Sequence, residues 1–133
     1  MKTITACMFA AAMTFISGCA MFASDNNYLD PEDFAVYLER DGLTVGKVRK
    51  LPPDPFLASA AVGIEVGGSE IGVYKYDRAS SVQKKRIEEL EKNGRVHIIG
   101  VPYPIKVKGS FMFFGLDRNP QKRAILKTID KFN

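Results

Sequence analysis

The sequence has few of the residues on which most catalytic and metal-binding sites depend. Its 133 residues include one histidine, two cysteines and no tryptophan. Cys7 lies inside the apolar N-terminal stretch and Cys19 stands at its end, so the chain beyond residue 19 has no thiol. That absence excludes disulfides and cysteine-ligated metal sites from a domain formed there. Such a domain must hold together by packing.

A long hydrophobic run is also missing. Residues 3–16 are apolar but fall short of the roughly 20 residues that cross a hydrocarbon core. Lys2 precedes this run, and the small residues Ser17 and Gly18 follow it. A positive start, a short apolar core and small residues before a cut are typical of a secretory signal. We therefore predict a signal peptide over residues 1–18.

The segment Ile16-Ser17-Gly18-Cys19 resembles the bacterial lipobox, in which an aliphatic and two small residues precede a cysteine. The resemblance implies a lipoprotein with a covalent lipid such as palmitate on Cys19. Ala20 implies the outer membrane facing the periplasm in a Gram-negative cell, and otherwise the outer face of the plasma membrane. Residues 19–28 would form a lipidated tether, and 29–133 a single domain. The alternative is ordinary secretion with cleavage after Ala20, which would remove Cys19 and leave a soluble protein.

Composition and charge narrow the classes of partner. A hydrophobic content of 46% is typical of a globular chain. Acidic residues concentrate in 24–41, whereas eight Lys or Arg and two Asp follow from Arg95 onward. This asymmetry would orient the domain above an anionic surface, or would simply make a solvated exterior. The basic excess is small, so we expect no nucleic-acid partner.

Hydrophobic periodicity and turn residues predict an α+β fold. Helices are expected from Asp30-Pro31 to Gly42, over 79–93, and after Asn119-Pro120, because a capping residue before proline starts a helix and glycine ends one. Strands are expected over 44–51, 60–66, 71–77, 95–100, 105–108 and 111–116. The predicted architecture is a mostly antiparallel sheet of about five or six strands with three helices, in the order α-β-ββ-α-β-ββ-α.

Two hairpins carry specific register predictions. In the first, a turn at Gly68-Ser69 would pair Val66 with Ile71 and avoid facing Glu65 with Glu70. In the second, a turn at Gly109-Ser110 pairs Lys108 with Phe111, Val107 with Met112, Lys106 with Phe113 and Ile105 with Phe114. The prolines of Val101-Pro102-Tyr103-Pro104 favour an edge or a crossing loop.

Residues 60–132 resemble a group of small bacterial lipoprotein and secreted domains whose function is uncharacterised. These domains have a strand ending in a Tyr-x-Tyr-like segment, a helix, and strands that pass through a proline and a glycine-led apolar stretch into a final helix. The corresponding residues are Val73-Tyr74-Lys75-Tyr76-Asp77, then Pro102, then 109–116. The resemblance brings no catalytic residues with it.

Aromatic residues on the strands are the candidate binding residues. They lie opposite the obvious core positions, with lysines nearby, and comprise Tyr74, Tyr76, Lys106, Lys108, Phe111 and Phe113. If these faces are open, they would bind a glycan, a peptide or a protein. The alternative is that the helices cover them and form a second packed layer.

Catalysis has one candidate residue, His97. A Ser-His-Asp assembly would have to use it, yet the serines lie in turns or caps without a nucleophile motif. No second histidine or paired carboxylates supply metal ligands. We predict a membrane-anchored, non-catalytic binding module of the cell envelope. Its partner would be an envelope protein or a wall polymer, and it would need no cofactor beyond the lipid on Cys19. The alternative is a small envelope hydrolase or modifying enzyme that uses His97.

Overall fold

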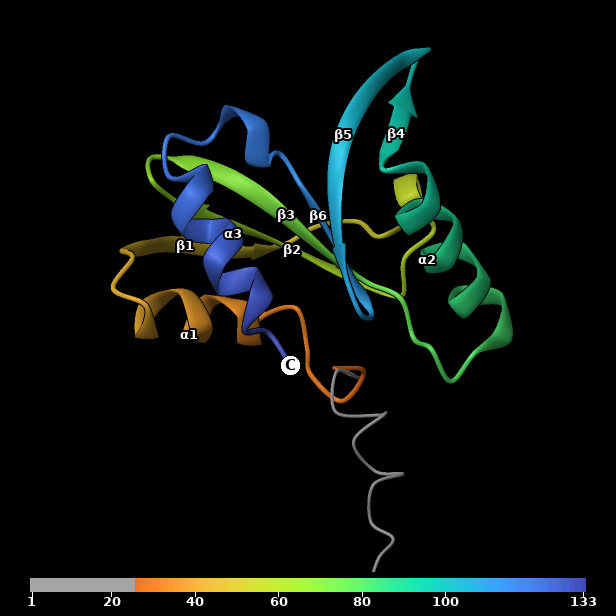
Figure 1. Ribbon diagram of the computed structural model, residues 1–133, viewed down its shortest axis with the longest axis horizontal. Coiled ribbons are helices and arrows are strands. Elements are labelled where there is room, and N and C mark those ends of the chain that lie inside the picture. Colours follow the sequence, from red (N-terminus) through yellow and green to blue (C-terminus); the bar gives the residue numbers. More distant parts are fainter. Residues whose placement is uncertain (1–25) are drawn as a thin grey trace, which may run out of the picture.

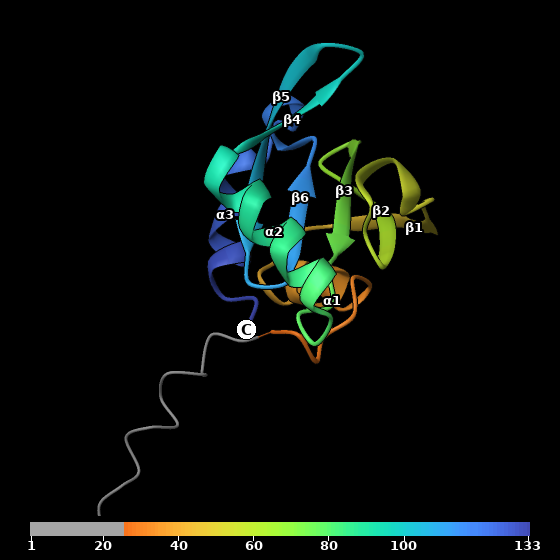
Figure 2. The same ribbon diagram turned by 90° about the vertical axis from the view of Figure 1, so that its right-hand side faces the viewer.

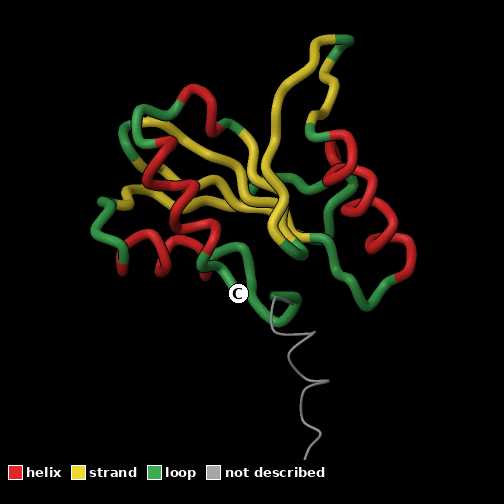
Figure 3. Tube along the Cα trace, viewed as in Figure 1, coloured by secondary structure: helices red, strands yellow, loops and turns green. Residues whose placement is uncertain are grey.

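The computed structural model describes residues 26–133, so the predicted signal peptide and Cys19 lie outside the described residues. A six-stranded antiparallel sheet has the strand order β1-β2-β3-β6-β5-β4 (Figures 1 and 3). The strands are β1 (Val45–Lys50), β2 (Ala60–Val66), β3 (Ser69–Lys75), β4 (Arg95–Ile98), β5 (Val101–Lys108) and β6 (Phe111–Phe114). The helices are α1 (Asp33–Arg40), α2 (Ser81–Asn93) and α3 (Lys122–Asp130), with short 3₁₀ turns η2 (Asp54–Phe56) and η3 (Leu116–Arg118). The predicted α+β class and element order are confirmed.

Helices cover both faces of the sheet, so side chains that alternate along each strand enter two separate cores. The first core joins α1 and α3 to one face and contains, among others, Phe34, Leu38, Ile64, Ile71, Val73, Phe111, Phe113, Ile125, Ile129 and Phe132. The second core joins α2 to the other face and contains Ala61, Tyr74, Tyr76, Ile87, Val96 and Met112. Within residues 26–133, no helix has the length and apolar character to cross a membrane.

The terminal helix follows the sequence pattern closely. The Asn119 side-chain oxygen accepts the backbone N–H of Gln121 (2.9 Å), while its amide nitrogen donates to the Val66 carbonyl (2.7 Å). Asn119 thus shapes the turn before α3 and ties it to the end of β2, whereas the N-cap of the helix is Gln121, which makes no side-chain capping bond. The predicted stripe Ile125, Ile129 and Phe132 is fully buried. On α2 the predicted stripe is only partly right, because Ile87 is buried whereas Val82 is 57% exposed.

The register predicted for the first hairpin is wrong. The turn is Gly67-Gly68, and Ile64 faces Ile71 while Glu65 faces Glu70. Both glycines have positive φ, +65° and +80°, which is what a two-residue type I′ turn requires. The charge conflict is relieved by β1, because the Arg49 guanidinium binds the Glu70 carboxylate through two hydrogen bonds of 2.7 and 2.9 Å. The second hairpin has the predicted register, including Ile105 opposite Phe114.

The segment containing the two prolines has one unpaired edge, as predicted. It is the first half of β5, and it pairs with β4 as His97↔Pro102 and Arg95↔Pro104. The second half of β5 pairs with β6 from Ile105 onward. The β4–β5 hairpin therefore stands out from the sheet as an arm (Figures 1 and 2). We refer to residues 95–104 as the arm.

The first described residues are fixed to the domain rather than free. The buried Asn26 side chain donates to the carbonyls of Lys108 (3.1 Å) and Phe132 (2.8 Å) and accepts the Ser110 backbone N–H (2.8 Å). Asn27 accepts the Arg78 backbone N–H at 2.8 Å. Residues 26–28, which the sequence assigned to the tether, are therefore part of the packed domain. The chain enters it beside the β5–β6 turn and the C-terminus (Figure 1).

Candidate binding cleft

A cleft of about 330 Å³ opens between the arm and the main sheet. It forms because β6 has four residues, whereas its neighbours β3 and β5 have seven and eight. The last pairs of β6 are Gly72↔Phe114 on one side and Ile105↔Phe114 on the other. Gly115 follows in a left-handed conformation (φ +89°) and turns the chain into η3. Beyond Phe114, β3 and β5 diverge with no strand between them (Figure 1).

Three aromatic rings, those of Tyr74, Tyr103 and Phe114, line the cleft. Tyr103 of the arm lies 5.8 Å, between ring centroids, from Phe114 of β6. Phe56 of η2 links Phe114 to Tyr74, with centroid separations of 5.4 and 5.0 Å. Leu51 and Pro104 also line the cleft. Packed rings of this kind give a rigid apolar surface, which is the usual lining of a ligand site.

Two glycines allow side chains to lie directly on the backbone at the floor of the cleft. Gly63 and Gly72 face each other on β2 and β3, in a row that runs from Arg49 to Phe114. The Glu70 carboxylate, held by Arg49, covers Gly63, and the Tyr74 ring covers Gly72, where an added Cβ would lie 2.8 Å from Tyr74 Cε1. A side chain at either glycine would displace these groups. The two glycines therefore shape the floor.

The two carboxylates at the rim are paired, whereas Arg118 makes no ion pair within residues 26–133. Glu70 binds Arg49 (2.7 Å), Asp117 binds Lys122 (2.6 Å), and the Arg118 guanidinium carbon lies 6.0 Å from the centroid of the Tyr103 ring. Burial, with a smaller contribution from Glu70, raises the pKa of the Tyr74 hydroxyl. Tyr74 is therefore a neutral wall of the cleft near pH 7. The site offers apolar contact and hydrogen bonds rather than a strong field of one sign.

Most of the side chains predicted to bind a ligand are not accessible. Tyr76, Phe111 and Phe113 are fully buried, and the Tyr76 hydroxyl donates to the Phe56 carbonyl at 2.6 Å. These rings belong to the two cores. For them the alternative prediction is correct, namely that helices cover the strand faces and form a second packed layer. Tyr74 alone among them lines the cleft, at 7% exposure.

The two candidate lysines behave differently from the rings. Lys106 is exposed and Lys108 half-buried, and neither lines the cleft. Both lysines belong to the second half of β5, which pairs with β6. The structure therefore does not gather the six predicted residues into one site.

His97, the only histidine, is exposed on β4 opposite Pro102. Within residues 26–133, no hydrogen bond or ion pair involves its ring, and it does not line the cleft. The same part of the chain contains no group of three or more His, Cys, Asp or Glu side chains placed to hold a metal ion. The geometry thus gives no acid or nucleophile next to this imidazole.

The sequence did not reveal the cleft because its residues come from four separate segments, at 51, 69–74, 103–104 and 114–118. Leu51, Gly72, Tyr103, Phe114 and Arg118 carry no common motif. Two signals were present: alternate prolines in β5, which have no N–H to donate to a neighbouring strand, and a glycine directly after the apolar run of β6.

Comparison with known proteins supplies no identity for the chain. No protein-family model matches it, and neither a curated protein nor a solved structure matches its sequence or fold.

Proposed function

We propose that this protein is a lipid-anchored binding module of the bacterial cell envelope, and that the cleft between the arm and the sheet is its binding site. The observation that supports this proposal most directly is the cleft of about 330 Å³, which is lined by the rings of Tyr74, Tyr103 and Phe114. This volume is at the small end of the range for ligand sites and suits one ring or one large side chain. The role is capture of an envelope protein or a wall polymer rather than catalysis.

The placement of the cleft supports capture away from the anchoring membrane. Asn26 is bound at the Ser110 end of β6, whereas the cleft begins at the Phe114 end. The arm points away from the start of the described chain in both views (Figures 1 and 2). An anchor at Cys19 would be seven residues before Asn26, so the base of the domain would lie near the lipid with the cleft facing outward.

The anchor and the binding site are tested separately. For the anchor, wild type and Cys19→Ser are grown with a labelled fatty acid and fractionated. We expect label and membrane association in the wild type only. A labelled, membrane-bound Cys19→Ser protein would refute the lipid assignment.

For the binding site, the Tyr103→Ser and Phe114→Ala variants are compared with Val82→Ser, a change on the exposed side of α2. The readout is the amount of envelope partner retained by each membrane-bound protein. We expect both cleft variants to lose most of the bound partner and Val82→Ser to retain it. Equal retention by all three variants would remove the cleft from the function.

A further inference from the structure

We propose, on the basis of the binding function above, that the ligand is an extended peptide segment of a partner protein. Its backbone would continue the line of β6 along the Ser69 end of β3, and one aromatic or large aliphatic side chain would lie in the cleft against the Tyr74 ring that covers Gly72. The ligand class follows from the hydrogen-bonding direction of the strands, the shape of the side-chain pocket and the state of the polar groups at the rim.

The direction of the backbone groups on β3 is fixed by the hydrogen bond from the Tyr76 N–H to the Ser110 carbonyl (2.8 Å). In an antiparallel strand every second residue bonds to the same neighbour. Tyr74 and Gly72 therefore bond toward β6, and Glu70 directs its N–H and carbonyl toward the place where β6 has already ended. Gly115 has no side chain there, and an added Cβ would lie 3.4 Å from the Glu70 carbonyl oxygen. The approach to this edge is open because residue 115 is glycine.

The opposite wall accepts hydrogen bonds but does not donate them. The Ile105 N–H donates to the Gly94 carbonyl (3.1 Å), so odd-numbered residues of β5 bond toward β4. Pro102 and Pro104 then direct their carbonyls into the cleft, and proline has no N–H. Each wall thus presents backbone groups that an inserted peptide can satisfy. Addition of a strand to an exposed sheet edge is a common mode of peptide recognition.

The pocket over Gly72 selects a side chain. Side chains of an inserted strand alternate between the two faces of the sheet, and one face here is closed by Leu116, which is buried in the first core. The other face opens on the cleft between the rings of Tyr74, Tyr103 and Phe114. One apolar side chain would fill this space among the rings, where a charged side chain would lose part of its hydration.

The state of the rim favours a peptide over a sugar. Recognition of a sugar depends on polar side chains that bind its hydroxyls, but the Glu70 and Asp117 carboxylates are engaged by Arg49 and Lys122. Backbone groups at Glu70, Pro102 and Pro104 point into the cleft, beside the hydroxyls of Tyr74 and Tyr103 and the Arg118 guanidinium. Backbone groups recognise another backbone.

The test uses the full chain, purified in detergent, and follows the amide signals of Glu70 and Gly72 and the ring signals of Tyr103 and Phe114 by NMR. The probes are blocked pentapeptides Thr-Val-X-Val-Thr with Phe, Tyr, Trp or Leu at X, the Phe peptide N-methylated at its three central residues, and p-cresol, a ring without a backbone. We expect at least one parent peptide to shift all four residues. N-methylation should weaken the Phe peptide about tenfold or more, because several hydrogen bonds are lost. Tyr103→Ser should weaken it similarly, whereas Ile99→Ser at the arm tip should have no effect.

Two outcomes overturn the proposal in different ways. If p-cresol shifts the rings but the parent and N-methylated peptides bind equally, strand pairing is wrong and the binding function of the cleft survives. If neither p-cresol nor any peptide shifts the four residues, both proposals fail.

Discussion

A single side chain, Asn26, determines how the domain begins. It is fully buried and bridges the β5–β6 turn to the C-terminal end through three hydrogen bonds to backbone groups. Gly109, at the centre of that turn, has a positive φ of +60°, and a Cβ on it would collide with the Asn26 side chain. Position 109 therefore requires glycine for two reasons, which are its positive φ and the close approach of the Asn26 side chain.

Replacement of Asn26 by alanine should therefore be costly. It would leave two carbonyls and one N–H buried without a partner, and we expect a loss of about 2–4 kcal/mol in the free energy of unfolding. Denaturant unfolding measures this, with Asn93→Ala at the exposed end of α2 as the matched control. A loss below about 0.5 kcal/mol would show that the segment at Asn26 is not held as described.

Two aspartates predict a specific dependence of stability on pH. The Asn27 amide and the Ala79 backbone N–H lower the pKa of Asp77, and Thr128 followed by Lys131 lowers that of Asp41. A carboxyl whose pKa is lower in the folded state stabilises the fold above its unfolded value, 3.8, and loses that contribution as the pH falls through the folded value. Stability should thus decrease below about pH 4. Asp77→Asn should flatten this decrease in unfolding experiments between pH 5 and 3, and a curve parallel to wild type would contradict the assignment.

At the scale of elements, the sequence was most informative where local chemistry and packing agree. The stripe of α3 and the hairpin around Gly109-Ser110 were predicted correctly, because each has one apolar pattern and one glycine turn. The first hairpin was predicted wrongly because Gly67, Gly68 and Ser69 allow two turns. The choice depends on Arg49, which lies on another strand and neutralises Glu70. The cleft could not be predicted either, because it depends on how β3, β5 and β6 lie side by side in the sheet.

The arm has an unusual tip. Ile99 is 96% exposed and has a positive φ of +50°, a rare conformation for a β-branched residue, and Gly100 follows with φ +76°. Asparagine fits this first position of a type I′ turn better. We expect Ile99→Asn to stabilise the protein by about 0.5–1 kcal/mol in thermal or denaturant unfolding. Destabilisation would mean that the tip makes a contact within the domain.

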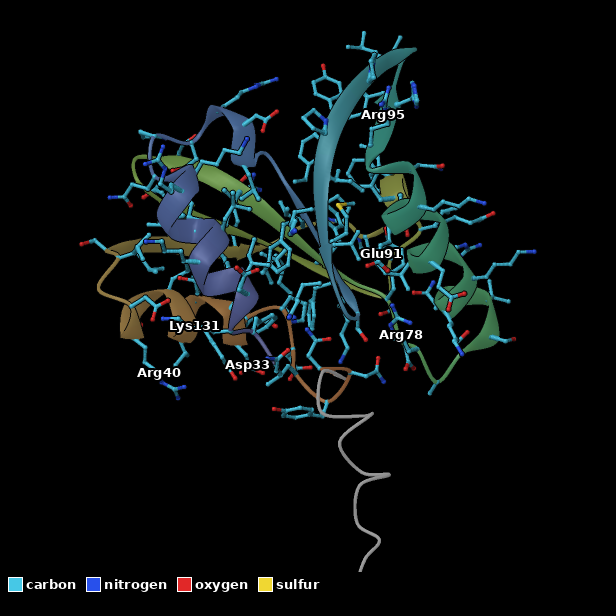
Figure 4. All side chains as sticks on the ribbon, in the orientation of Figure 1. Asp33, Arg40, Arg78, Glu91, Arg95 and Lys131 are labelled. Atoms are coloured by element: carbon cyan, nitrogen blue, oxygen red, sulfur yellow. The ribbon has the colours of Figure 1, made fainter. Side chains whose placement is uncertain are left out.

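At the scale of the whole molecule, the charges that the sequence divides between its two ends meet in the structure. Asp41, after α1, binds Lys131, after α3, at 2.9 Å, and the Thr128 hydroxyl donates to Asp41 at 2.6 Å. Arg40 and Lys131 lie on the α1–α3 side of the molecule, away from Arg95 on the arm (Figure 4). This ion pair is exposed and contributes little stability by itself. It links the first and last helices beside the entry of the chain.

This arrangement predicts how the anchored protein stands on a membrane. With the lipid on Cys19, Tyr28 lies at the base of the domain and Ile99 at the far tip of the arm. We expect a fluorophore on Tyr28→Cys to be quenched by spin-labelled lipids in vesicles, and one on Ile99→Cys to be unaffected. Equal quenching at both positions would show that the domain lies on its side.

We propose that the cleft holds the partner of a lipid-anchored protein. The most direct measurement places a photo-crosslinking residue at position 103 in intact cells, with position 82 on the outer side of α2 as the control. We expect a discrete adduct from position 103, none from position 82, and loss of the adduct when Phe114→Ala is added. Adducts of equal yield from both positions, or none from position 103, would contradict the proposal.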